Sequence, residues 1–272
     1  MYLIILIFVP VQKNFLKMKR GLVKYIILLA MLALPLSAFA ENGKFYTRKA
    51  LLEDFPARVT KVVLSGNAIS DAVFREEVTL RWNLSPYEFC TVDDYEALKE
   101  DPNYYFLHFV KLDDVIFLSL DKGGRKDDPD VKKQSFEVIS IPVSGADAQV
   151  LDNLGYLPGF IDVIQNFVEN AMTSDSKAYT GLAQYNFNDI GKRRIILDPE
   201  KAGEAFRDGH ADTLIGISVS AGKPIIGSWC YKMLISCDTH QIFYFKKHKI
   251  TEKQKEGWLA SEIKRFNGNS AE

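Results

Sequence analysis

The chain contains little cysteine and little histidine: three cysteines and four histidines among 272 residues. Three cysteines allow at most one internal disulfide, so a scaffold held together by several disulfides is excluded. The sequence also lacks C-x-x-C, H-E-x-x-H, G-x-S-x-G and the glycine-rich phosphate loops. Without these local signatures we expect no metal site and no resident cofactor, and we have no motif that identifies an enzyme.

A long hydrophobic run is also missing. The main apolar stretch, residues 25–36, is 12 residues long, whereas a transmembrane helix needs about 20. Basic residues at 18–24 precede it and Ala-Phe-Ala at 38–40 follows it. A basic start, an apolar centre and an A-x-A end are the three parts of a secretory signal peptide. We therefore predict translation from Met18, cleavage after Ala40, a periplasmic or secreted protein, and no transmembrane anchor after cleavage.

Positive charge is scarce in the segment that would remain. Residues 1–40 contain five of the 34 basic side chains and none of the 35 acidic ones. The remainder therefore has 29 basic and 35 acidic side chains, a net charge of −6. Nucleic-acid binding proteins normally show the opposite balance. We expect no nucleic-acid partner.

Strand-like and helix-like patterns alternate along the rest of the chain. An extended run at 58–64, a helical stripe at 68–82 and a short strand at 87–90 predict a parallel strand pair joined by a crossover helix. Further predicted strands are 103–112, 114–123, 134–143, 193–198 and 213–220; further predicted helices are 92–100, 157–171, 199–209 and 251–266.

This order predicts an α+β fold: a mixed β-sheet with an antiparallel meander and a C-terminal hairpin, with helices packed on the sheet. We expect residues 41–272 to form a single domain, with a candidate seam between two lobes near 173–181.

The stretch "SWCYKMLISCDTHQIFYFKKHKI", residues 228–250, contains two cysteines and two histidines. Cys230 and Cys237 are an odd number of residues apart, so in one strand they point to opposite faces, about 23 Å apart. A disulfide needs Cα atoms within about 7 Å. We interpret the stretch as a β-hairpin with unlinked thiols, and His240 as the turn residue that takes a positive φ. A disulfide from Cys90 to either cysteine is the alternative.

Three segments together resemble a family of exported proteins from Bacteroidota-type bacteria with no assigned function: "RWNLSPYEFC" (81–90), "YLPGFIDVIQNFVENAM" (156–172) and "GSWCYKMLISCDTHQIFYFKKHKI" (227–250). The resemblance covers most of residues 50–266. It implies a bacterial envelope location, and it supplies no catalytic residues.

Two functions follow as hypotheses. The preferred one is a non-catalytic envelope protein that binds a partner protein or an envelope component. Aromatic residues at strand edges are the candidate contact residues: Tyr104, Tyr105, Trp229 and Tyr231. For each of them a core position is the favoured interpretation.

The alternative is a hydrolase whose site assembles from distant residues. Its candidate catalytic residues are His108, Asp114 and His248. For His108, which stands in an apolar strand pattern, a hydrogen-bonded core position is the competing interpretation.

Overall fold

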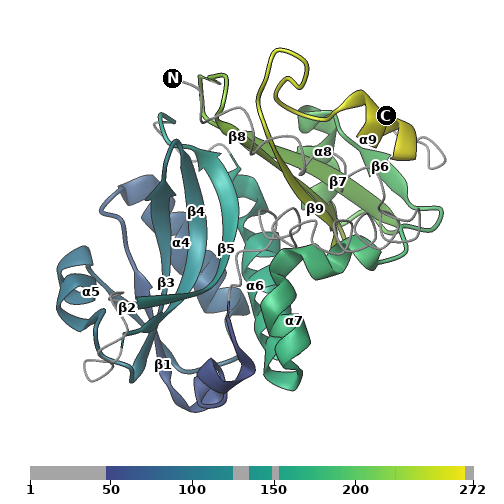
Figure 1. Ribbon diagram of the computed structural model, residues 1–272. Helices are drawn as coiled ribbons and strands as arrows, with labels where there is room; N and C mark the ends of the chain where they lie inside the picture. The colour runs from purple at the N-terminus through teal and green to yellow at the C-terminus, as the bar shows by residue number, and fades with distance from the viewer. Residues whose placement is uncertain (1–46, 125–134, 149–152, 224, 267–272) are drawn as a thin grey trace, which may run out of the picture. The chain divides into compact units, whose positions relative to one another are not determined.

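The computed structural model describes residues 47–124, 135–148, 153–223 and 225–266. All of them belong to the second of two units into which the chain divides, Phe45–Glu272, the first being Met1–Lys44. The predicted signal peptide, with its start and cleavage site, lies outside the described residues. The α+β class is confirmed, but the described strands form two mixed sheets where the sequence led us to expect one (Figure 1).

The first sheet has five strands in the order β2-β1-β3-β4-β5. Its strands are β1 Val59–Val63, β2 Tyr87–Cys90, β3 Tyr104–Leu112, β4 Val115–Gly123 and β5 Ser135–Gly145. Strand β1 pairs in parallel with both β2 and β3, whereas β3, β4 and β5 form an antiparallel meander. The crossover and the meander are thus as the sequence predicted.

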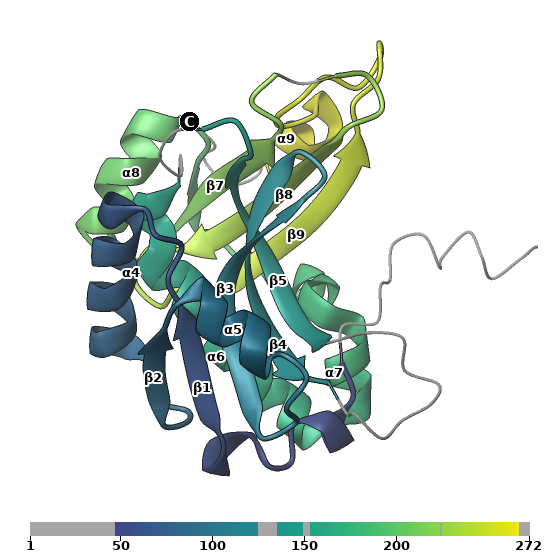
Figure 2. The same cartoon turned by 90° about the vertical axis from the view of Figure 1, so that its left-hand side faces the viewer.

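The two crossover helices of this sheet begin at side-chain caps. Helix α4, Ala68–Arg81, starts at Asn67, whose side-chain oxygen accepts hydrogen bonds from two backbone N–H groups of the first turn. Helix α5, Val92–Leu98, starts at a reciprocal capping box between Thr91 and Asp94. Helix α4 buries Phe74 and Val78 in the main core, while α5 lies over the other face of the sheet (Figure 2).

The second sheet has four strands in the order β6-β7-β8-β9. Its strands are β6 Arg194–Ile196, β7 Thr213–Ser220, β8 Trp229–Ser236 and β9 Ile242–Lys249. Strands β6 and β7 are parallel and are joined by α8, Pro199–Arg207. Strands β7, β8 and β9 are antiparallel, so the predicted C-terminal hairpin is confirmed.

The hairpin turn and the cysteines also agree with the sequence interpretation. His240 has a φ of +53°, and its Nδ1 lies 2.6 Å from a carboxylate oxygen of Asp162. All three cysteines are free and buried. Cys237 packs in the main core, whereas Cys230 faces the other side of the sheet, where its sulfur accepts the N–H of Gly257 at 3.3 Å. The alternative of a disulfide from Cys90 is wrong in this structure.

Helix α6, Leu157–Thr173, contributes to a core that both sheets share. Gly159 lies against Phe206 of α8 so closely that a Cβ at this position would stand 2.9 Å from the ring. A larger residue would push the helix away from the second sheet. Turns and short helices flank α6: η3 Leu154–Tyr156, α7 Asp175–Thr180 and η4 Gly181–Phe187. The predicted seam at 173–181 corresponds largely to α7, and the domain boundary itself stays a prediction.

The two ends of the described chain are less regular than the sequence pattern. The N-terminal part forms short turns, η1 Lys49–Leu51 and η2 Phe55–Ala57. The helix predicted at 251–266 is wrong in its first half, because α9 spans only Ala260–Phe266. Gly257 has a φ of +77° there, a conformation outside the right-handed helical region.

The outer edge of β9 is covered by η4 and the residues after it. The Asn186 side chain donates to the carbonyl of Phe245 at 2.8 Å and accepts the N–H of the same residue at 2.7 Å. Asn188 donates to the carbonyl of Ile242 at 3.0 Å. Two side-chain amides therefore occupy main-chain groups to which a further strand would bond.

Candidate functional site

A cleft of about 350 Å³ is lined by the β3–β4 turn, the β7–β8 loop and the start of β8. The β3–β4 turn belongs to the first sheet, and the β7–β8 loop with the start of β8 belongs to the second. These two segments are about a hundred residues apart in the chain. Its lining combines two aromatic rings, two carboxylates, one lysine and several aliphatic side chains. A concave site that combines apolar surface with a few polar groups is typical of a binding site.

The aromatic part of the cleft is Trp229 and Tyr231. They are alternate residues of β8 and share one face of the strand. Tyr231 packs edge-on against Phe117 of the first sheet, with ring centroids 5.2 Å apart. The ammonium groups of Lys247 and Lys249 lie 4.5 and 5.3 Å from the centre of the Trp229 ring. These contacts fix both rings before any ligand is present.

Tyr231 is a hydroxyl donor at neutral pH. Burial raises its pKa to about 12, and the negative charges of Asp113 and Glu137 contribute to the shift. Neither its hydroxyl nor the indole N–H of Trp229 has a hydrogen-bond partner among the described residues. The two rings thus offer polar groups as well as apolar surface.

The carboxylates belong to the two-residue turn Asp113–Asp114 between β3 and β4. Asp113 has a φ of +52°, a left-handed conformation that glycine adopts more easily than aspartate. Within the described part of the chain, neither carboxylate forms a hydrogen bond or an ion pair. Local backbone strain and two unpaired charges therefore coincide at the edge of the cleft.

The exposed aliphatic side chains of Leu112 and Ile225 line the same cleft, and that of Ile226 follows in the chain. Leu112, Ile225 and Ile226 are 43%, 64% and 66% exposed, and they make up three of the seven large apolar side chains exposed in the described residues. Leu112 directly precedes the aspartate turn, and the two isoleucines belong to the β7–β8 loop. Clustered exposed apolar side chains beside aromatic rings are typical of a contact surface.

Three of the sequence-predicted site residues meet in this cleft: Asp114, Trp229 and Tyr231. The other four lie elsewhere. His248 is buried on the outer face of β9, where its Nε2 lies 2.8 Å from the carbonyl oxygen of Lys255. Tyr104 is half-buried on β3, where the ammonium of Lys61 lies 4.9 Å from its ring centre.

His108 occupies a buried polar cluster on β3 and β4. Its Nε2 lies 3.0 Å from one oxygen of Asp121, and Ser119 donates to the other oxygen at 2.6 Å. The carboxylate therefore stands between the serine and the histidine. In a serine hydrolase the histidine stands between them and removes the serine proton. This cluster satisfies buried polar groups, but it does not activate a nucleophile.

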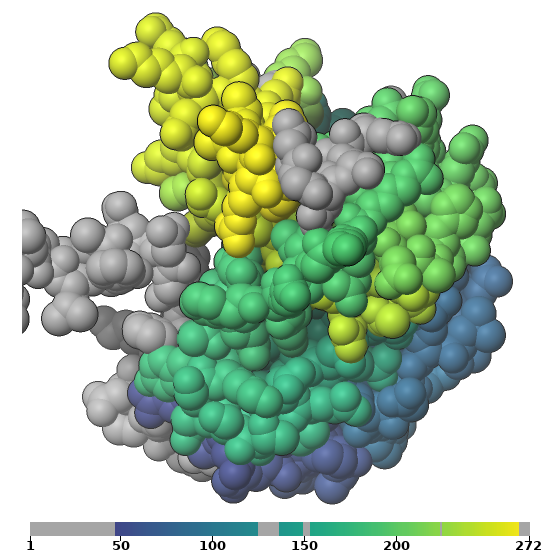
Figure 3. Space-filling model, turned by 90° about the vertical axis from the view of Figure 1, so that its right-hand side faces the viewer, coloured from purple at the N-terminus to yellow at the C-terminus, as the bar shows by residue number. Residues whose placement is uncertain are grey.

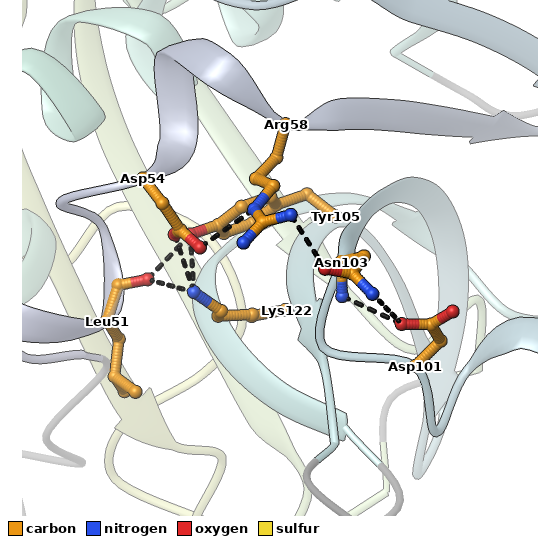
Figure 4. Close-up of polar contacts among 7 residues, drawn as sticks. All are labelled: Leu51, Asp54, Arg58, Asp101, Asn103, Tyr105 and Lys122. Atoms are coloured by element: carbon orange, nitrogen blue, oxygen red, sulfur yellow. Dashed lines mark hydrogen bonds and ion pairs between the residues drawn. The ribbon is translucent and has the colours of Figure 1, made fainter.

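Tyr105 is fully buried and belongs to a network that Figure 4 shows. Lys122 Nζ contacts three oxygens: the carbonyl of Leu51 at 3.0 Å, Asp54 Oδ1 at 2.7 Å and the Tyr105 hydroxyl at 3.0 Å. Arg58 donates to the second oxygen of Asp54 at 3.0 Å. All three donors of the ammonium are used, so the network fastens the turns η1 and η2 to the first sheet.

The charges of this network are stable over a wide pH range. Burial alone would raise the pKa of Asp54, but hydrogen bonds from Lys122, Tyr105 and Arg58 outweigh burial and lower this pKa to about 2. Burial, together with the bond to Asp54, raises the pKa of Tyr105. The phenol therefore remains protonated, and it is not a ready general base.

Sequence reasoning missed the aliphatic part of the cleft. One signal was available, since Ile225 and Ile226 stand together between Gly222 and Gly227, in a loop where polar residues are usual. Lys249 was noticed only as part of a basic strand end. Its role beside Trp229 depends on the register of β8 and β9, which pairs these two residues.

Among the residues that the structure describes, no group of three or more His, Cys, Asp or Glu side chains could hold a metal ion. Over the same residues, no helix is both long and apolar enough to span a bilayer. No family model, curated protein or solved structure matches this chain. The resemblance to exported proteins therefore stays a prediction.

Proposed function

We propose that this is an exported or cell-envelope protein that acts as a non-catalytic interaction module, with the cleft as its binding site. The observation that carries the proposal is the convergence of Trp229, Tyr231 and the Asp113–Asp114 turn with two exposed aliphatic side chains, those of Leu112 and Ile225. Aromatic anchors with an apolar surround and charges at the rim are the usual composition of an energetically important protein contact.

The lining favours binding over chemistry. It contains no histidine and no cysteine, and its one serine, Ser228, donates its hydroxyl proton to the carbonyl of Ile225 at 2.7 Å. A hydrolase would need a nucleophile in contact with a base. The alternative candidates His108 and His248 lie on different sheets, each held by its own hydrogen bond. No observation in the described residues favours the hydrolase.

The cleft fits a segment of a partner protein that carries an apolar side chain next to a lysine or arginine. The apolar side chain would contact the exposed aliphatic residues and the rings of Trp229 and Tyr231. The basic residue would pair with Asp113 and Asp114, which have no cation of their own among the described residues. Lys249 is already placed against the Trp229 ring. Charge complementarity therefore favours a basic partner over an acidic one.

Selection from a displayed peptide library against the purified protein tests this proposal. We expect enriched peptides to combine an apolar residue with a neighbouring Lys or Arg. Trp229→Ala should weaken their binding at least about thirtyfold, as expected for a central aromatic anchor. Asp113→Asn keeps a side chain that tolerates positive φ but removes the charge. It should weaken binding several-fold and reduce the dependence of affinity on salt.

Ile225→Ala and Leu80→Ala form a matched pair of test and control. Both side chains are exposed, but of the two only Ile225 lines the cleft. Only Ile225→Ala should lower affinity. Failure to enrich any peptide, or enriched peptides that bind all four variants equally, would contradict the proposed site. The export part is tested separately, by N-terminal sequencing of the protein from an envelope fraction, where the first residue should be Glu41.

A further inference from the structure

A second cavity, of about 330 Å³, has a composition unlike that of the cleft. It is formed by residues of α6, α7, η4 and the β8–β9 turn, and the face of the molecule that carries α7 is shown in Figure 3. Five side-chain amides line it: Asn166, Asn170, Gln184, Asn188 and Gln241. It shares no residue with the cleft.

Two of these amides are held in fixed orientations by the main chain. Gln184 Nε2 donates to the carbonyls of Gly181 and Lys177 at 2.9 and 3.1 Å. Asn188 Nδ2 donates to the carbonyl of Ile242 at 3.0 Å. Because the nitrogens are occupied, the side-chain oxygens of Gln184 and Asn188 remain as acceptors whose positions are set before a ligand arrives.

The donors come from other residues of the lining. Lys177 Nζ donates to Asn170 Oδ1 at 3.1 Å, and its ammonium carries two further protons. The side chains of Asn166 and Gln241 have no hydrogen bond to another described residue, so each offers both a donor and an acceptor. The cavity therefore presents donors and acceptors in similar number.

Tyr185 supplies the most telling polar group. Its hydroxyl is buried and has no hydrogen-bond partner in the described part of the chain. Burial raises its pKa to about 12, an effect that the nearby amide of Asn170 partly offsets. The Nδ2 of that amide donates one proton to the carbonyl of Asn166, and its Oδ1 accepts from the ammonium of Lys177. A buried hydroxyl without a partner destabilises the fold unless something else bonds to it.

We propose that this cavity binds a neutral saccharide. Hydroxyl groups both donate and accept, which matches a lining of amides, one phenol and one ammonium. The lining contains no carboxylate, so nothing in it would pair with a cationic ligand, and one lysine is too little to favour a phosphate. The half-buried ring of Tyr185 adds an apolar surface of the kind that sugar C–H groups contact.

Saturation-transfer difference NMR on the purified protein tests the proposal, with N,N′-diacetylchitobiose and cellobiose as probes. We expect transfer to at least one of them at millimolar concentration. Tyr185→Phe should reduce its affinity about fivefold to tenfold, and Asn166→Ala should reduce it about threefold, since each loses one direct bond. Tyr185→Phe should leave the protein at least as stable as before, because it removes a hydroxyl without a partner.

Tyr87→Phe is the matched control, since it makes the same change on β2 of the first sheet and should leave affinity unchanged. Trp229→Ala tests independence, because it should weaken peptide binding at the cleft and leave the affinity for the saccharide unchanged. Absence of transfer to both probes would overturn the proposal. Transfer that persists unchanged in Tyr185→Phe and in Asn166→Ala would overturn it equally.

Discussion

Each sheet holds one end of the described chain through a cluster of a lysine, a carboxylate and a tyrosine. In the first sheet, Lys122, Asp54 and Tyr105 fasten the N-terminal turns η1 and η2 (Figure 4). In the second sheet the ammonium of Lys232 lies 2.5 Å from Glu262 of α9. The same carboxylate accepts the hydroxyl of Tyr244 at 2.7 Å.

The two clusters differ in how far water reaches them. The side chains of Lys232 and Glu262 are 0% and 5% exposed, whereas those of Lys122 and Asp54 are 9% and 36% exposed. Burial acts against the charge of Glu262, yet the bonds from Lys232, the Leu259 N–H and Tyr244 lower its pKa. Removing one partner of the ion pair should therefore lower the free energy of unfolding much more in the buried Lys232–Glu262 cluster than in the partly exposed Lys122–Asp54 cluster.

The largest effect is expected for Lys232→Met. It leaves the buried carboxylate of Glu262 without its cation, which should lower the free energy of unfolding by about 3–5 kcal/mol. Chemical denaturation measures this change. Lys246→Met is the control, because Lys246 pairs directly across from Lys232 but is exposed, and it should change stability by less than about 0.5 kcal/mol.

The double variant Lys232→Met, Glu262→Leu sharpens the same test. Replacing both charges by apolar groups should recover most of the loss, because no unpaired charge remains. If Lys232→Met alone lowers the free energy of unfolding by less than about 1 kcal/mol, water reaches the Glu262 carboxylate and the comparison fails.

Removing the tyrosine hydroxyl from each cluster should change the free energy of unfolding by smaller amounts. Tyr244 supplies the one hydrogen bond to Oε1 of Glu262 among the described residues, so Tyr244→Phe should lower unfolding free energy by about 1–2 kcal/mol. Tyr105→Phe should lower it by less than about 1 kcal/mol, because Lys122 still donates to Leu51 and to Asp54. Thermal and chemical unfolding of the two variants would rank them. The reverse ranking contradicts the comparison.

The smallest effect is expected in acid. The folded-state pKa of Asp54 is about 2, below the value of about 3.9 for an unfolded chain. Between these values the unfolded state binds more protons, so stability rises with pH. The contribution of Asp54 is complete above about pH 4 and is lost as pH falls toward 2. Because this carboxylate is more than a third exposed, we expect about 1 kcal/mol at most.

Asp54→Asn should flatten the dependence of unfolding free energy on pH between 2 and 4. Glu53→Gln, at the neighbouring exposed position, is the control and should leave that slope unchanged. An unchanged slope in Asp54→Asn would mean that the first cluster does not hold the carboxylate ionised.

Local patterns predicted most of the elements. The stripes at Phe74 and Val78 and along α6 gave helices, and the alternating runs gave the meander and the hairpin. His240 was assigned a positive φ because of its place in the turn, and the structure agrees. These features depend on neighbours within a few residues, which is the range that periodicity and turn chemistry report.

Features that depend on distant partners could not be predicted in this way. Lys232 and Glu262 are 30 residues apart, and nothing in either local pattern indicates a bond between them. The last helix was also predicted too long, because the apolar pattern does not indicate the φ of +77° that Gly257 adopts. In the cleft, the aromatic residues and Asp114 were candidates, but their meeting depends on how two loops from different sheets come together.

The amide of Asn186 has a consequence for how copies of this chain behave together. A strand edge with free N–H and C=O groups is a template on which a second chain can add a strand. Asn186 occupies both main-chain groups of Phe245 with one side chain. Opening this position would offer β9 to a neighbouring molecule and start edge-to-edge aggregation. One asparagine thus helps keep the second sheet from growing beyond its own chain, even where the protein is concentrated.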